Sequence, residues 1–128
     1  MDFSNNPDLF LTIVIACLGL GIKLIGSGIK TLQYKESNRI QSMQNELLKF
    51  NCTLDIESDD LIYLRPKTLI NTNDIISIST YNDHRIALAF SPLTLLGFKL
   101  EINNFGVVSK SYPNFFNDLK QFGVRIQK

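Results

Sequence analysis

Two short motifs carry the residue types that bind small anions. The first runs from Lys35 to Arg39 and places two cations, a carboxylate and a hydroxyl within five positions. The second runs from Asn82 to Arg85 and combines a carboxylate, an imidazole and a guanidinium group. A guanidinium group grips a carboxylate or phosphate through two parallel hydrogen bonds, and a lysine adds a compact positive charge. The two motifs therefore indicate a site for a small, multiply charged anion.

The first motif lies at a predicted helix start. Residues 29–34 are typical of an extended segment. The apolar residues that follow the motif recur at the spacing of one helical face, namely Ile40, Met43, Leu47 and Phe50. Ser37 is a natural N-cap, so we expect a helix from Ser37 to about Phe50, with Arg39 in its first turn. Its free N–H groups and dipole favour an anion, although the motif alone also fits a solvated, charged helix start.

Carboxylates and one more lysine accompany the other predicted helix starts. Asp8 follows a typical start, Asn6 and Pro7, while Asp83 opens a second apolar helix and Lys110 precedes the last helix. Together with Glu36, the two aspartates are candidates for acid, base or orienting roles. For Asp8 and Asp83, helix capping is an alternative that can hold alongside such a role.

The remaining pattern predicts a mixed α/β chain. In the first half of the chain we expect a helix from Asn6 to Gly19 or Gly21, a strand-like segment at 23–34 with a turn near 26–28, the helix at 37–50, and a hairpin of strands 53–57 and 61–65. In the second half we expect a polar loop at 71–74, a strand at 75–80, a helix from Asp83 to about Leu96, a strand-like segment at 98–108, and a helix from Pro113.

The two halves of the chain match at an offset of 75 residues. Asp8 then falls on Asp83 and Lys35 falls on Lys110, with the elements in the same order. We therefore interpret the chain as one domain or partial domain with two copies of a supersecondary unit, at about 1–70 and 71–128. Because equivalent ends of repeated units face the same side, the candidate helix starts are expected to come together.

Composition narrows the possible partners. With 128 residues and 45% apolar content, the chain can form one packed domain. A net charge of +1 and a pI near 7.7 give no broad basic field, which argues against nucleic acid. The apolar stretch from Leu9 to Ile22 is too short to span a bilayer, so it predicts a buried core helix and no membrane partner.

The cysteine and histidine content predicts neither a metal site nor a disulfide framework. Cys17 and Cys52 fit no zinc spacing, and they favour a reducing, cytoplasmic setting. The single histidine, His84, stands at a helix start, where histidines more often support a site than react in it. We therefore rank Arg85 above His84 and give His84 and Asp83 supporting roles.

Five motifs in register resemble the 3-phosphoshikimate 1-carboxyvinyltransferases, also called 5-enolpyruvylshikimate-3-phosphate (EPSP) synthases. They are Asn6 to Asp8, Lys35 to Arg39, Glu46 to Phe50, Tyr81 to Arg85 and Lys110 to Phe116. The resemblance implies an inside-out α/β barrel portion built from βαβαββ units with buried apolar helices. It also implies that the chain is the C-terminal part of the enzyme, that an N-terminal domain is missing, and that Met1 begins a truncated form.

The resemblance further implies a reaction. In this family, the enolpyruvyl group of phosphoenolpyruvate moves to the 5-hydroxyl of shikimate 3-phosphate, phosphate is released, and no metal or organic cofactor takes part. Asp8 matches the proton acceptor near the 5-hydroxyl, and Glu36 matches a glutamate linked to proton transfer at the methylene. Lys35 matches a lysine that contacts shikimate 3-phosphate. The cations that match the phosphoenolpyruvate site are Arg39, Arg85 and Lys110.

One position departs from the family pattern. Asn38 stands where an acidic residue is usual, so either the orientation of Arg39 is looser or the amide replaces the missing hydrogen bond. The alternative to a transferase is a non-catalytic anion-binding or assembly module with the same basic cluster. If a repeat is missing, apolar faces stay exposed and the fragment is expected to self-associate. On its own it is expected to be inactive.

Overall fold

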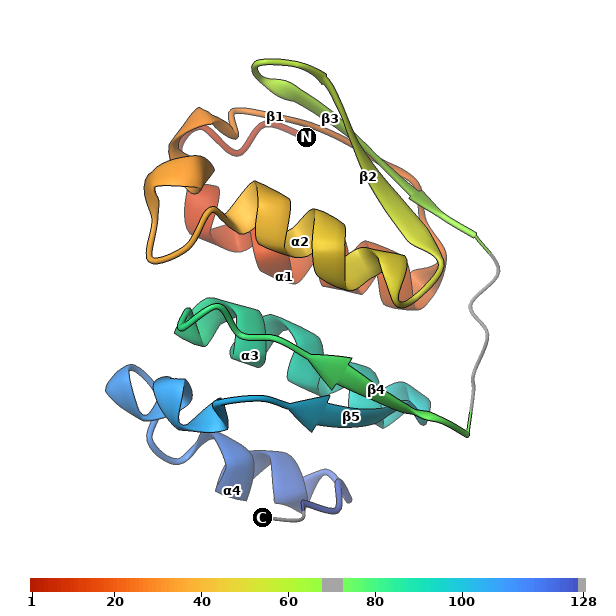
Figure 1. Ribbon diagram of the computed structural model, residues 1–128, viewed down its shortest axis with the longest axis vertical. Coiled ribbons are helices and arrows are strands. Elements are labelled where there is room, and N and C mark those ends of the chain that lie inside the picture. The colour runs from red at the N-terminus through yellow and green to blue at the C-terminus, as the bar shows by residue number, and fades with distance from the viewer. Residues whose placement is uncertain (68–72, 127–128) are drawn as a thin grey trace. The chain divides into compact units, whose positions relative to one another are not determined.

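The computed structural model describes residues 1–67 and 73–126. The chain divides into two compact units, Met1–Ile70 and Asn71–Lys128, and each is described here by itself. Both are mixed α/β units (Figure 1). Of the polar loop predicted at 71–74, residues 71 and 72 lie outside the described part of the chain.

Unit 1 packs two helices against one face of a three-stranded sheet (Figure 1). Its elements are a 3₁₀ turn η1 (Pro7–Leu9), α1 (Phe10–Leu20), β1 (Leu24–Ser27), a 3₁₀ helix η2 (Lys30–Tyr34), α2 (Arg39–Leu48), β2 (Cys52–Ser58) and β3 (Leu61–Pro66). The strand order is β1-β3-β2, and β3 is antiparallel to both neighbours. Asp2 bridges Ser27 in parallel, so the N-terminal residues extend the sheet beside β1.

Helix α1 is the buried core helix that the sequence predicts. Five of its apolar side chains are buried: Phe10, Leu11, Val14, Ile15 and Leu18. The helix ends at Gly21, whose φ of +69° is in the left-handed region. The N–H of Gly21 donates to Leu18 O at 3.2 Å and that of Ile22 to Cys17 O at 2.8 Å, a Schellman motif. No helix in the described part of the chain is long and apolar enough to cross a membrane.

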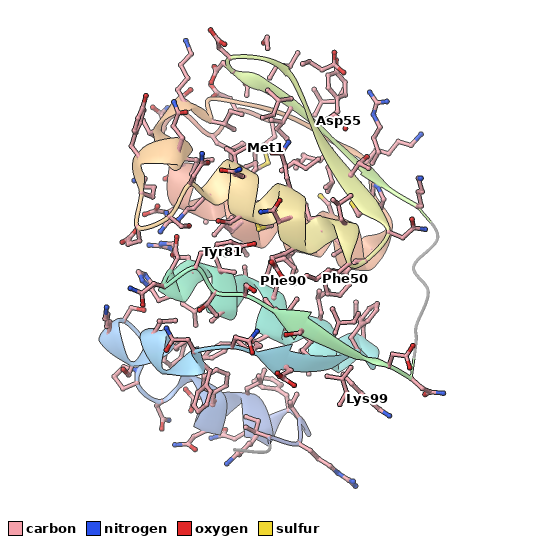
Figure 2. All side chains as sticks on the ribbon, viewed as in Figure 1. Met1, Phe50, Asp55, Tyr81, Phe90 and Lys99 are labelled. Atoms are coloured by element: carbon pink, nitrogen blue, oxygen red, sulfur yellow. The ribbon has the colours of Figure 1, made fainter. Side chains whose placement is uncertain are left out.

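The hairpin of β2 and β3 lies where the sequence predicts it. Leu54, Ile62 and Leu64 are buried beneath the sheet, while Asp55 points to the opposite face (Figure 2). In addition to the pairing of β3 with β1, side-chain hydrogen bonds attach the hairpin to the rest of unit 1. Gln44 of α2 donates to Leu54 O at 2.9 Å. At the hairpin turn, Asp60 Oδ1 accepts a hydrogen bond of 2.8 Å from the N–H of Ile29.

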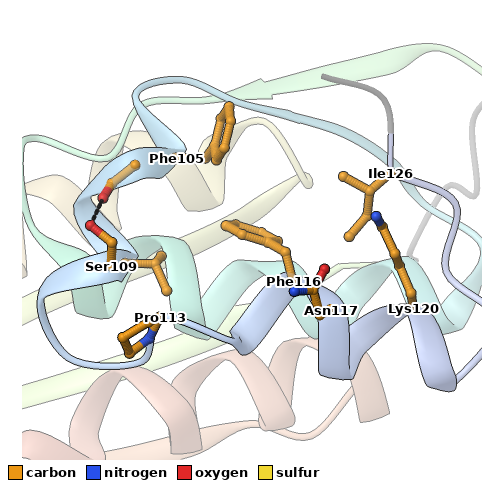
Figure 3. A pocket seen from close by; sticks show the side chains of 9 residues that line it. Phe105, Ser109, Pro113, Phe116, Asn117, Lys120 and Ile126 are labelled. Atoms are coloured by element: carbon orange, nitrogen blue, oxygen red, sulfur yellow. Dashed lines mark hydrogen bonds between the residues drawn. The ribbon is translucent and has the colours of Figure 1, made fainter.

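Unit 2 contains β4 (Ile75–Ile78), α3 (His84–Phe90), η3 (Ser91–Leu96), β5 (Lys99–Ile102), η4 (Phe105–Lys110) and α4 (Phe115–Gln121). Strands β4 and β5 are parallel and lie side by side (Figure 1). Its small core consists of Ala87, Val107 and Val108 with partly buried neighbours. A pocket of about 150 Å³ lies between η4 and α4 (Figure 3); its lining includes Phe105, Ser109, Pro113, Phe116, Asn117 and Lys120.

The offset of 75 residues also relates elements of the two units. It carries the bounds of β1 onto those of β5, and it carries η2 onto η4. Helix α2 corresponds in the same way to α4, and the parallel bridge between Asp2 and β1 corresponds to the pairing of β4 with β5. Unit 1 thus has the order αβαββ, preceded by the bridge at Asp2 in place of a first strand, and the described part of unit 2 has the order βαβα.

Two strand predictions are wrong in part. Residues 29–34 were expected to be extended, but Lys30–Tyr34 is a 3₁₀ helix. Its N-cap residue Ile29 and its residue Leu32, three positions apart, are both buried. Residues 98–108 form a strand only over Lys99–Ile102, after which Phe105–Lys110 is again 3₁₀. In the first segment the buried residues are three positions apart, and in the second they are the neighbours Val107 and Val108. Neither pattern is the burial of every second residue that a strand needs. The last helix also starts at Phe115 rather than Pro113.

Gly28 occupies a crowded left-handed position beside the N-terminal turn. Its φ is +74°, and a Cβ there would overlap the Ser4 backbone nitrogen and the Asp2 carboxylate. That carboxylate accepts hydrogen bonds from Ser4 Oγ (2.6 Å) and Ser4 N (2.9 Å), which lower the pKa of Asp2. Side chains longer than hydrogen are therefore excluded at Gly28 by both backbone conformation and space.

We predict that Gly28→Ala destabilises unit 1 by more than Gly21→Ala does. Gly21 has a similar positive φ of +69° but open space around it, so its substitution costs only the backbone strain, roughly 1–2 kcal/mol. Urea unfolding followed through the amide signals of unit 1 measures both variants. Equal losses would mean that the contacts with Asp2 and Ser4 do not restrict this position.

Candidate anion-binding site

Four of the predicted site residues meet in unit 1. Arg39 Nη1 lies 3.0 Å from Asp8 Oδ1, and Arg39 Nη2 lies 2.7 Å from Glu36 Oε2. Lys35 Nζ lies 3.8 Å from the same Asp8 oxygen. The cluster therefore contains two cations and two carboxylates, joined by the guanidinium group of Arg39.

The helix arrangement explains why residues far apart in sequence meet. Helices α1 and α2 begin at the same end of unit 1 (Figure 1), and η1, which carries Asp8, leads directly into α1. Arg39 is the first residue of α2. Lys35 and Glu36 lie in the bend between η2 and α2, so both helix starts supply charged groups to one place.

Burial divides the cluster into an inner and an outer part. The Arg39 side chain is 1% exposed, whereas those of Asp8 and Glu36 are 46% and 50% exposed. A buried guanidinium is costly unless carboxylates compensate its charge. Arg39 is thus fixed inside unit 1, and each carboxylate has one side toward Arg39 and another toward solvent.

Asn38, rather than Ser37, is the N-cap of α2. Its Oδ1 accepts a hydrogen bond of 3.2 Å from the N–H of Gln41. The prediction of Ser37 is wrong because two good capping residues stand side by side, and only the path of the chain selects between them. Asparagine and aspartate cap helices about equally well, so the amide at position 38 is sufficient to start the helix.

In unit 2, Asp83 caps α3 as the sequence predicts. Its Oδ1 accepts a hydrogen bond of 3.1 Å from the N–H of Arg85, and the residue is fully buried. His84 and Arg85 form the first turn of α3, and Lys110 ends η4, which packs against α3. Because the two units are described separately, a joint clamp of Arg39 with Arg85 and Lys110 stays a prediction.

A tight turn precedes Asp83. Tyr81 and Asn82 have φ values of +53° and +57°, and the N–H of Asp83 donates to Thr80 O at 2.8 Å. Two successive left-handed residues closed by this hydrogen bond are typical of a type I′ turn, which is strained at Tyr81 because it is not a glycine. This turn is not among the elements predicted from the sequence, although Asn82 is a residue type that tolerates the left-handed conformation.

The profile of one family, EPSP synthase (3-phosphoshikimate 1-carboxyvinyltransferase), matches residues 1–119. The chain belongs to the EPSP synthase family. This confirms the resemblance drawn from the five motifs.

The chain is also similar in sequence to individual EPSP synthases. The 3-phosphoshikimate 1-carboxyvinyltransferase of Bacteroides fragilis (strain YCH46) is 33% identical over 127 residues, which are 98% of this chain and 31% of that protein. That of Buchnera aphidicola subsp. Baizongia pistaciae is 35% identical over 121 residues, 94% of this chain and 27% of that protein. The chain spans about a third of the length of the curated relatives it matches.

A solved EPSP synthase structure has the same fold. The enzyme from Acinetobacter baumannii superposes with a TM-score of 0.74 at 26% identity, covering 94% of this chain and 28% of that one. The predicted mixed α/β class of the enolpyruvyl-transferase type is thereby confirmed.

We predict that Asn38→Ala destabilises unit 1 by about 1 kcal/mol, the usual value of an N-cap side chain. Asn38→Asp is the matched control, because aspartate keeps the oxygen that accepts the capping hydrogen bond. It should leave the free energy of unfolding near that of the wild type. Urea denaturation measures both. An alanine variant as stable as the wild type would contradict the capping role of Asn38.

Proposed function

We propose that this chain forms part of an EPSP synthase active site. The complete enzyme would transfer the enolpyruvyl group of phosphoenolpyruvate to the 5-hydroxyl of shikimate 3-phosphate and release phosphate. The observation that supports this most is the cluster of Asp8, Lys35, Glu36 and Arg39 at two helix starts, in a chain of this family. The proposed setting is the cytoplasm, where the shikimate pathway supplies aromatic amino acids.

The charges of the cluster suit the two substrates. Both carry phosphate and carboxylate groups, which guanidinium and ammonium groups bind. In our proposal, Arg39, Arg85 and Lys110 hold phosphoenolpyruvate, and Lys35 contacts shikimate 3-phosphate. His84 and Asp83 support Arg85 from the start of α3, where Asp83 caps the helix.

The two carboxylates are proposed to move the protons. In the addition step, the 5-hydroxyl oxygen bonds to C2 of phosphoenolpyruvate and its proton passes to Asp8. The methylene carbon takes a proton from Glu36, which must enter this step as the neutral carboxylic acid. In the elimination step, the C2–O bond to phosphate breaks and the departing phosphate carries away the proton that Asp8 had taken up. Glu36 takes a proton back from the methyl group, which restores the double bond. Without substrate, Asp8 and Glu36 both contact Arg39, so both carboxylates start beside the proposed phosphoenolpyruvate site.

The partner that this proposal requires is the rest of the enzyme. The chain spans about a third of its curated relatives, so the remaining cations of the site would come from the portion that it does not include. Self-association of the isolated chain also stays a proposal. Exposed apolar side chains such as Leu20, Tyr34 and Phe122 support it, and sedimentation velocity at high concentration tests it.

We predict that the 128-residue chain binds phosphoenolpyruvate and shikimate 3-phosphate weakly but turns over neither. Without the remaining enzyme, the site can neither enclose the substrates nor exclude water. Amide chemical shifts at Lys35 to Arg39 and at Arg85 report binding, and a phosphate-release assay with both substrates reports turnover.

The two measurements also separate the alternatives. Steady-state turnover by this chain would contradict the predicted inactivity. Indifference to both substrates, combined with a response to another phosphate compound or to a protein, would favour a non-catalytic anion-binding or assembly module. Lys23→Ala, which removes a lysine outside the cluster, is the control for nonspecific attraction of anions and should bind as the wild type does.

A further inference from the structure

The guanidinium group of Arg39 is ligated by the chain's own carboxylates. Asp8 Oδ1 accepts a hydrogen bond of 3.0 Å from Arg39 Nη1, and Glu36 Oε2 accepts one of 2.7 Å from Arg39 Nη2. A ligand carboxylate that binds an arginine side-on uses two neighbouring N–H groups. In this arrangement, a ligand that approaches Arg39 through Nη2 meets a position already taken by Glu36.

Arg39 itself is not free to turn toward a ligand. Its side chain is 1% exposed, and its backbone is the first turn of α2, whose start is fixed by the Asn38 cap. Any exchange of partners must therefore take place through movement of the carboxylates.

The two carboxylates differ in how they are held. Asp8 lies in η1, directly before the buried helix α1, and the Lys35 ammonium group is also within 3.8 Å of it. Glu36 lies in the bend between η2 and α2 and has a longer, half-exposed side chain. Rotation of the Glu36 side chain alone can carry its carboxylate into water, whereas Asp8 is confined by the turn that carries it.

We propose that Glu36 is a displaceable internal ligand of Arg39, which a substrate carboxylate replaces on Nη2. This inference rests on the proposed function, because it takes phosphoenolpyruvate as the incoming carboxylate. The exchange keeps the charge around the buried guanidinium constant, since one carboxylate leaves as another arrives.

Two consequences follow for the site. First, Glu36 competes with the ligand, so the affinity of the wild-type site is lower than that of a site without this contact. Second, the carboxylate of Glu36 becomes available for proton transfer only when a ligand occupies Arg39. Substrate binding and the release of this group are then one coupled equilibrium.

The test compares variants that keep or remove the charge of Glu36. Glu36→Asp keeps the negative charge but is one methylene shorter, so it cannot maintain the 2.7 Å contact in the same backbone position. Glu36→Gln removes the charge and keeps the length. Glu57→Gln removes a charge from an exposed glutamate on β2 that pairs with Arg65, and it serves as the control for net charge.

Phosphoenolpyruvate is titrated into each 128-residue variant, and its Kd is obtained from amide shifts of unit 1. We expect Glu36→Asp and Glu36→Gln to bind about two- to fivefold more tightly than the wild type, the upper range for losing one partly exposed ion pair. Glu57→Gln should match the wild type. In the wild type, the carboxyl ¹³C signal of Glu36 should move on binding far more than that of Asp8.

The outcomes separate this inference from the proposed function. If phosphoenolpyruvate shifts Lys35 and Arg39 but both Glu36 variants bind equally or more weakly, Glu36 only orients Arg39, and the inference fails while the function stands. A gain in Glu36→Gln alone would be a pure charge effect and would also overturn the inference. If no variant binds, both the inference and the proposed function fail. Unchanged unit 1 spectra without ligand establish that the variants are folded.

Discussion

The charge of a guanidinium group inside a protein must be compensated. In unit 1, the buried Arg39 imposes this requirement on the residues around it. Its two carboxylates come from positions 31 and 3 residues away. To bring Asp8 to Arg39, α1 and α2 must begin at the same end of the sheet. To bring Glu36 there, the chain must bend sharply before α2. The ion cluster and the packing of the two helices therefore depend on each other.

Local patterns predicted the elements whose signals do not depend on distant residues. The apolar run of α1 with its terminal Gly21, the hairpin around Asp60 and the Asp83 cap were all identified from the sequence. The pattern failed where it was ambiguous. Ile29 and Leu32 suit either a strand or a 3₁₀ turn, and only their joint burial selects the turn.

The candidate site was predicted as a set of residues but not as an arrangement. Residue types and spacing singled out Lys35, Glu36 and Arg39, and the repeat added Asp8 as an equivalent of Asp83. What the sequence did not indicate is that Arg39 is buried and already holds two carboxylates. Burial depends on α1 and the sheet, which no local window contains. The contact between Glu36 and Arg39 had one signal in the sequence, which is a glutamate three residues before an arginine at a helix start.

The hydrogen bond between Asp60 and Ile29 gives the hairpin turn a role beyond closing two strands. Ile29 directly precedes η2, and η2 leads into the bend that carries Lys35 and Glu36. The turn at 59–60 is polar and would ordinarily be a convenient place to insert an epitope tag or a fluorescent label. In this protein, an insertion there would release one end of the segment that carries two site residues. The exposed end of α1 near Leu20 is a better place for a label, because the Leu20 side chain is 71% exposed and lies at the opposite end of α1 from Asp8.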